Sequence, residues 1–129
     1  MAGSISYTHE KTGDVRVVRV NWTGDASDGS VPSLVLPAFG GRILALETNP
    51  GATAPTASYD IAITDGHGHD VLQGVGANRS ATATEKVAVV YSGTAIHPPV
   101  VVGDTLTLAL TNNSAVSATG EIDIYYGVA

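Results

Sequence analysis

The feature that most constrains this chain is a two-residue alternation of apolar and polar side chains along residues 104–111. There Leu106, Leu108 and Leu110 alternate with polar or small residues, threonines above all. Successive side chains of a β-strand point to opposite faces of its sheet, so this period predicts a strand with leucines inside and threonines outside. Such a strand belongs to a sheet that has one face on a hydrophobic core.

The same alternation recurs along the rest of the chain. At the carboxyl end the two predicted faces consist of Ile122, Ile124 and Tyr126 on one side and Glu121, Asp123 and Tyr125 on the other. Further runs predict strands at residues 5–9, 15–22, 42–48, 59–64, 86–91 and 100–102. Leu44 and Leu46 are expected on one face of their strand. Arg16 and Arg19 fall on opposite faces of theirs, which predicts either a bulge or cover on both faces.

Glycine, proline and small polar residues gather between these runs, as in residues 24–32 and 49–55. Several short strands with turn residues between them are typical of sandwiches and barrels. We therefore predict an all-β fold, an antiparallel β-sandwich or jelly roll of about seven to nine strands. The length suits one domain spanning residues 1–129.

The charge content is low for a soluble domain. Charged residues make up 14% of the chain, against about 25% on average, which favours an exterior that contacts other subunits. The formal charge is −6 and the six basic residues are scattered, so no nucleic-acid partner is expected. No membrane span or signal peptide is expected either, because no long apolar run occurs. The chain has no cysteine, which excludes a disulfide framework.

The densest polar cluster lies at residues 65–70, where Asp65, His67, His69 and Asp70 could hold a divalent metal. The His-x-His spacing is similar to the first cupin motif, but Ile61 stands where that motif has glycine and its glutamate is missing. The preferred interpretation is a tight turn in which Gly66 and Gly68 adopt positive φ and Asp65 bonds back to the turn. No metal or cofactor is therefore predicted.

No other motif predicts catalysis, and the chain is not expected to be an enzyme. Residues 74–80 are only loosely similar to a phosphate-binding loop, since the closing Gly-Lys-Ser/Thr is missing. No Gly-x-Ser-x-Gly elbow occurs. Trp22 and Tyr125 are candidates for a glycan-binding platform, although core packing is the expected role of Trp22 and Phe39.

From Tyr59 onward the chain resembles small tailed-bacteriophage proteins of the virion. The segments that carry this resemblance are YDIAITD (residues 59–65), DVLQGVGANRSAT (70–82) and PVVVGDTLTL (99–108). Such proteins look like jelly-roll decoration, or cement, proteins of the phage head. The resemblance implies a protein that stabilises the head by binding the major capsid protein lattice as a homo-dimer or homo-trimer. It also implies a place on the capsid exterior after synthesis in the host cytoplasm.

Two alternatives stay open at this point. One is a tail, baseplate or fibre-associated β module, with or without glycan binding, and the other is a metal-dependent jelly-roll enzyme with His67 and His69 as ligands. For the virion protein, the candidate contact loops are residues 23–32 and 49–55. The candidate interface residues are Trp22, Asp25, Asp28, Arg79 and Tyr125.

Overall fold

The computed structural model describes residues 1–11, 13–37, 40–89, 99–101 and 105–127. These residues form β-strands joined by loops and turns, with no helix among them. The strands are β1 (Ser4–Glu10), β2 (Val15–Thr23), β3 (Leu34–Val35), β4 (Gly41–Pro50), β5 (Asp60–Thr64), β6 (Glu85–Ala88), β7 (Val100–Val101), β8 (Thr107–Thr111) and β9 (Thr119–Gly127). Phe39 and the end of the strand predicted at 86–91 lie outside the described residues.

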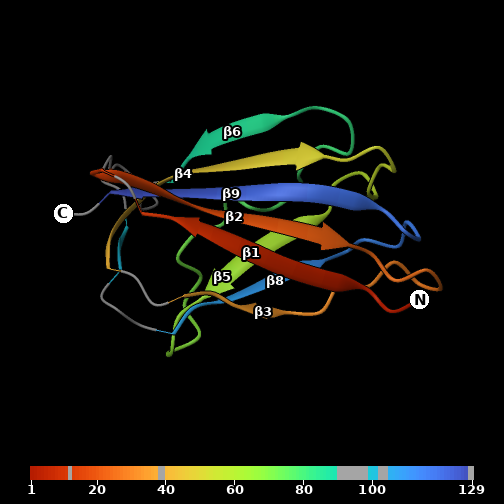
Figure 1. Ribbon diagram of the computed structural model, residues 1–129, viewed down its shortest axis with the longest axis horizontal. Coiled ribbons are helices and arrows are strands. Elements are labelled where there is room, and N and C mark those ends of the chain that lie inside the picture. The colour runs from red at the N-terminus through yellow and green to blue at the C-terminus, as the bar shows by residue number, and fades with distance from the viewer. Residues whose placement is uncertain (12, 38–39, 90–98, 102–104, 128–129) are drawn as a thin grey trace.

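The strands form two antiparallel sheets packed face to face (Figure 1). The larger sheet has the order β1-β2-β9-β4-β6, with β7 also paired to β4, and the smaller has the order β3-β8-β5. From β2 to β6 each strand lies in the other sheet from the one before it, as in a jelly roll. The predicted all-β sandwich is therefore confirmed, and its strand number falls within the predicted range.

The core lies between the two sheets and consists of the inward faces that the alternation predicts. Ile122, Ile124 and Tyr126 of β9 are buried there, opposite Leu108 and Leu110 of β8 in the other sheet. Trp22 is 2% exposed and packs against Tyr59, with ring centroids 5.9 Å apart. Side chains from both sheets thus share one continuous apolar cluster.

The prediction for β4 is wrong in one detail. The register of β4 against β9 shifts between Ile43 and Ala45, which marks a bulge at Leu44. As a result Ile43 and Leu46 are both fully buried, and Leu44 is not on the face of Leu46. A bulge inserts one residue and moves the following side chains to the other face, and the two-residue count cannot foresee it.

The two arginines of β2 have a simpler explanation than a bulge. The register of β2 is continuous against both β1 and β9. Arg16 lies near the end of the inward face and donates to the carbonyl of Gly13 at 3.2 Å, whereas Arg19 lies on the outer face. On that outer face Val17 is 7% exposed, so β2 is covered on both sides near Arg16.

Residues 70–79 take the place of a fourth strand in the smaller sheet. They run along the free edge of β5 and join it by antiparallel bridges at Thr64–Asp70 and Tyr59–Arg79. Between the bridges the chain makes successive turns, and the amide of Ile61 donates to the carbonyl of Gly76 at 2.8 Å. The described residues include no helix long and apolar enough to cross a membrane.

Candidate interaction surface

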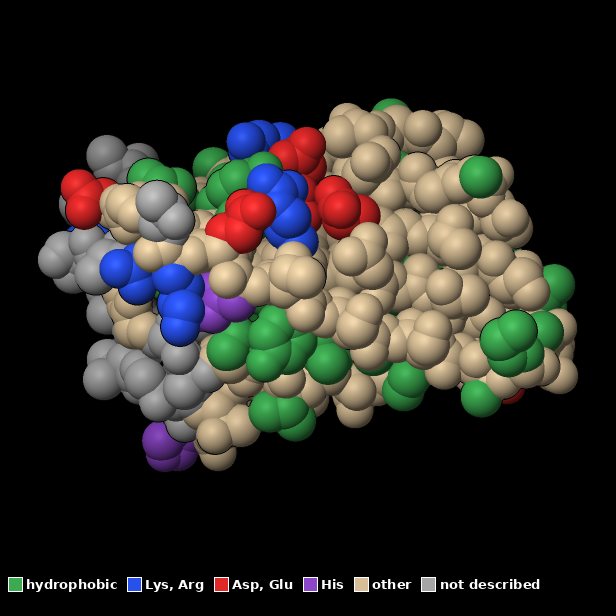
Figure 2. Space-filling model, viewed as in Figure 1, with side chains coloured by type: hydrophobic (Ala, Val, Ile, Leu, Met, Phe, Trp, Pro, Cys, Tyr) green, Lys and Arg blue, Asp and Glu red, His purple; other side chains and the backbone are tan. Residues whose placement is uncertain are grey.

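One end of the sandwich is built from three loops that we call the loop end: residues 24–31, 50–58 and 112–118. In Figure 1 it lies on the right, beside the amino terminus. It includes most of both loop regions that the sequence suggested as contacts, residues 23–32 and 49–55. Asp25 and Asp28 are its only charged residues. Figure 2 shows that charged side chains on this view gather over the middle and the opposite end instead.

Asn113 joins all three loops of this end. Its side-chain nitrogen donates to the carbonyl of Gly29 at 2.7 Å, and its side-chain oxygen accepts from the amide of Thr56 at 2.9 Å. The hydroxyl of Thr56 in turn accepts from the amides of Ser114 and Ala115, at 2.9 and 3.1 Å. The loops thus hold one another in place, which gives the surface a defined shape before anything binds to it.

The two aspartates of the loop end are used within their own turn. Asp25 accepts from the amide of Ser27 at 2.6 Å, and Asp28 accepts from the amide and the hydroxyl of Ser30 at 2.9 and 2.7 Å. These bonds from Ser30 lower the pKa of the Asp28 carboxyl. Both residues lie on the surface where the sequence analysis placed an interface, although their carboxylates have backbone partners already.

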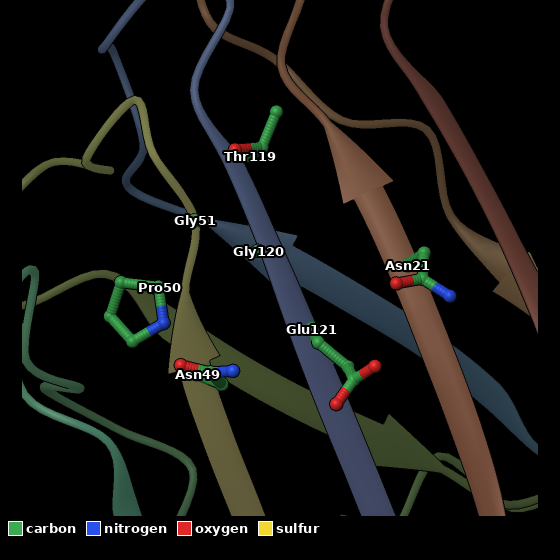
Figure 3. Close-up of a pocket in the computed structure, with 7 residues that line it drawn as sticks. All are labelled: Asn21, Asn49, Pro50, Gly51, Thr119, Gly120 and Glu121. Atoms are coloured by element: carbon green, nitrogen blue, oxygen red, sulfur yellow. The ribbon is translucent and has the colours of Figure 1, made fainter.

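A shallow hollow of about 230 Å³ adjoins the loop end on the outer face of the larger sheet. Its lining residues, shown in Figure 3, are Asn21, Asn49, Pro50, Gly51, Thr119, Gly120 and Glu121. Glu121 of β9 lies directly across from Asn21 of β2 on one side and Asn49 of β4 on the other. The hollow is small and contains one carboxylate, which fits a surface for polar contacts better than a site for catalysis.

Further along the same face a row of charged residues crosses four strands. In the order of the strands across the sheet, the row consists of Arg19 on β2, Asp123 on β9, Glu47 on β4 and Lys86 on β6. Each of these residues lies directly opposite the next. Arg19 contacts Asp123 at 2.9 Å, and Lys86 approaches Glu47 at 4.0 Å. Opposite charges therefore meet at both ends of the row, while two carboxylates meet at its centre.

Asp123 has the most perturbed acid–base behaviour of the described residues. Burial raises its pKa to about 6, with a further contribution from Glu121, and the attraction of Arg19 opposes both effects. The same ion pair raises the pKa of Arg19. The contact thus stabilises the charged form of Arg19. For Asp123, which is 4% exposed, burial and the neighbouring carboxylates outweigh the stabilisation that Arg19 gives to its charged form.

Tyr125 belongs to this charged row. Its hydroxyl donates to Glu47 at 2.9 Å, and the ammonium of Lys86 lies 4.2 Å from the centre of its ring. It is half-buried, so its ring is only partly available as a contact surface. Tyr125 was predicted to be an interface residue together with residues of the loops, but it lies on β9, away from the loop end.

Two of the interface candidates, Trp22 and Arg79, have little exposed surface. Trp22 is buried in the core, where the hypothetical Cβ of Gly120 would lie only 2.8 Å from its indole. The Arg79 side chain is 14% exposed and pairs with Glu85 at 3.5 Å. Both residue types are common at interfaces. The core packing that the sequence predicts for Trp22 is confirmed, and Arg79 offers only a small part of its side chain to a partner.

Residues 65–70 form the predicted turn at the end of the sandwich opposite the loop end. Asp65 accepts from the amides of His67 and His69 at 2.9 and 3.0 Å, and Gly68 has a φ of 80°. Gly66 does not have positive φ, contrary to the prediction. The Asp70 carboxylate also accepts backbone amides, those of Leu72 and Gly74 in the segment that follows it. Among the described residues, no group of three or more potential ligands is placed to hold a metal.

Asn113 and the charged row were not among the features predicted from the sequence. Asn113 lies in a segment rich in asparagine and serine that predicted only a turn, and nothing in one sequence pairs it with Thr56 or Gly29. The charged row had a weak signal, because Asp123 was placed on the outer face of its strand. Its neighbours across the sheet depend on strand order, which the sequence did not specify.

No protein-family model and no curated protein sequence matches this chain. Two solved structures align with nearly all of it. One is the acidic stable capsid structure of Helicobacter pylori bacteriophage KHP30, with 7% identity and a TM-score of 0.44 over 96% of this chain and 93% of that chain. The other describes Bacillus endospore appendages that form disulfide-linked pili, with 20% identity and a TM-score of 0.28 over 100% and 93% of the two chains.

Proposed function

We propose that this chain is a structural protein of a tailed-phage virion. In the proposed role it decorates the head, binds the major capsid protein lattice as an oligomer and stabilises it. The observation that carries the proposal is the loop end, a nearly uncharged surface whose three loops are fixed by Asn113. The resemblance of residues 59–129 to phage decoration proteins supports the same role.

A surface that packs against a capsid lattice has to be desolvated and held in one conformation. Charged residues are depleted at the centres of protein interfaces, because burying them costs desolvation energy. A surface whose loops are already ordered also loses less conformational entropy when it binds. The loop end has both properties, and Val116 adds an apolar side chain that is 48% exposed.

The alternatives have less support from the described residues. A glycan-binding module needs exposed aromatic rings, and Trp22 is buried while Tyr125 is half-buried beside Lys86. A metal-dependent jelly-roll enzyme needs its ligands inside the sandwich, and His67 and His69 are exposed in a turn at its end. Neither arrangement provides the surface that these functions require.

The test is co-sedimentation of the purified chain with candidate empty phage heads. We expect stoichiometric binding, and we expect Val116→Asp to weaken it at least about tenfold, because the change buries a charge in the contact. Val15→Asp is the matched control, since Val15 is 58% exposed at the far end of β2. Failure of the wild-type chain to sediment with any head, or full occupancy by the Val116 variant, would contradict the proposal.

A further inference from the structure

The two sheets have four edges, and three of them are protected against pairing with another strand. The edge beside β4 is formed by two short strands, β6 with four residues including Lys86 and β7 with two residues. The β3 edge has two residues and lies between Pro32 and Pro37. The β5 edge is covered by residues 70–79. Short strands, lysine, proline and covering segments are the usual means by which sheet edges avoid association.

The β1 edge has none of these features. It is seven residues long, pairs with β2 over its whole length without a bulge, and contains no proline, glycine or lysine. No described strand pairs with its other side. The backbone groups on that side therefore form a regular row that a further strand could bond.

An apolar strip accompanies this edge. Ile5, Tyr7 and His9 share the inward face of β1, and Tyr7 is 39% exposed although it points toward the core side. Val35 on the β3 edge is 60% exposed. Figure 2 shows hydrophobic side chains gathered between the positions that β1 and β3 have in Figure 1. The open side of the sandwich is thus apolar at the place where β1 has no neighbour.

We propose that the occupant of the β1 edge is β1 of a second copy of this chain, paired antiparallel about a two-fold axis at Tyr7. This edge would be the surface through which the chain self-associates. The proposal rests on the proposed function only because that function includes an oligomer. The larger sheets of the two copies would join into one continuous sheet across the axis.

Self-complementarity argues for a second copy over another partner. Pairing centred on Tyr7 uses all seven residues, and places Ile5 opposite His9 and Ser6 opposite Thr8 of the other copy. On the outer face of β1, polar residues then lie opposite polar residues. On its inward, apolar face, Tyr7 lies opposite Tyr7 of the other copy. The single acid of the strand, Glu10, would face Ser4 and is already paired with Arg19 at 3.4 Å. No like charges oppose each other, although each chain carries a formal charge of −6.

Cysteine cross-linking tests the pairing, because the natural chain has no cysteine. In this register the two Tyr7 Cα atoms would be about 4.5–5.5 Å apart, within the range of a disulfide. Tyr7→Cys should therefore form a covalent dimer under mild oxidation. Ser4→Cys alone should not, because its two copies would be about 20 Å apart. A mixture of Ser4→Cys and Glu10→Cys should form the mixed dimer.

Light scattering of the full chain without capsids gives the second measurement. We expect a dimer, and we expect Tyr7→Lys to raise its dissociation constant at least about tenfold by opposing two ammonium groups. A monomeric wild-type chain whose Tyr7→Cys variant does not cross-link would overturn the proposal. A dimer that Tyr7→Lys leaves intact would overturn it as well. Because capsids are absent, either failure is separate from the outcome of the co-sedimentation test.

Discussion

At the scale of single residues, Asp123 makes the stability of this protein depend on pH in an unusual direction. Its pKa is about 6 in the folded chain, against about 3.9 for an unfolded aspartate. A carboxyl with a raised pKa binds its proton more tightly in the folded state. Its contribution to the free energy of unfolding is therefore fully present below about pH 4 and is lost as the pH rises through about 6. This contribution is at most about 3 kcal/mol.

Asp123→Asn should remove this loss, because the amide does not titrate. Urea unfolding at several pH values between 4 and 7 measures the slope of the free energy of unfolding against pH. At pH 7 the variant should be at least as stable as the wild type, since Arg19 is 37% exposed and keeps Glu10 as a partner. Glu10→Gln is the control, because it removes the other carboxylate paired with Arg19 and keeps Asp123, so the loss of stability with rising pH should persist. An equal slope in Asp123→Asn would show that another group causes the pH dependence.

Asp28 and Asp65 affect a different pH range. Hydrogen bonds from Ser30 lower the pKa of Asp28, and those from the amides of His69 and His67 lower the pKa of Asp65. Their contributions are present above the unfolded value and are lost as the pH falls through the folded one. Both effects thus lie below about pH 4, outside the range in which Asp123 titrates.

At the scale of elements, Asp70 fixes the segment that completes the smaller sheet. One carboxylate oxygen accepts the amides of Ile63 and Leu72 at 3.2 and 3.0 Å, and the other accepts the amide of Gly74 at 3.0 Å. Asp70→Ala should lower the free energy of unfolding by about 1–3 kcal/mol, because partly buried amides lose a charged acceptor. Chemical denaturation measures this value.

Asp65→Ala is the matched control for Asp70→Ala. Asp65 also accepts two amides, those of His67 and His69, but in an exposed turn where water can replace the carboxylate. The control should cost less than Asp70→Ala. Equal costs would mean that residues 70–79 do not depend on Asp70 for their position along β5.

The elements themselves were predictable where the alternation is regular. The faces of β8 and β9 follow directly from their sequences, because each strand has one apolar and one polar side. The bulge at Leu44 was not predictable, since residues 43–46 are all apolar and their sequence does not show which of them face the core. Trp22 was an interface candidate because it ends a predicted strand, and Arg79 because it lies in a predicted connector. Their low exposure depends on contacts with Tyr59 and Glu85 that only the folded chain forms. The site depends more than the strands do on such distant pairings, so less of it could be predicted.

At the scale of the whole molecule, the single core that joins both sheets should make unfolding one cooperative transition. Trp22 is the only tryptophan, and it reports on this core through its contact with Tyr59. Its fluorescence and the far-ultraviolet circular dichroism of the strands should therefore give the same denaturant midpoint. Distinct midpoints would mean that the sheets unfold separately.

Gly120→Ala tests the same core by adding one methyl group. The new Cβ would lie 2.8 Å from the indole of Trp22, so either the ring or β9 must shift, at a cost of about 1–3 kcal/mol. Because one core serves both sheets, fluorescence and circular dichroism should move together by this amount. Gly127→Ala on the same strand is the control, since its nearest neighbour, a methyl of Leu44, would be at an ordinary 3.5 Å. A shift of fluorescence alone would show that the packing around Trp22 is local and that the sandwich does not depend on it.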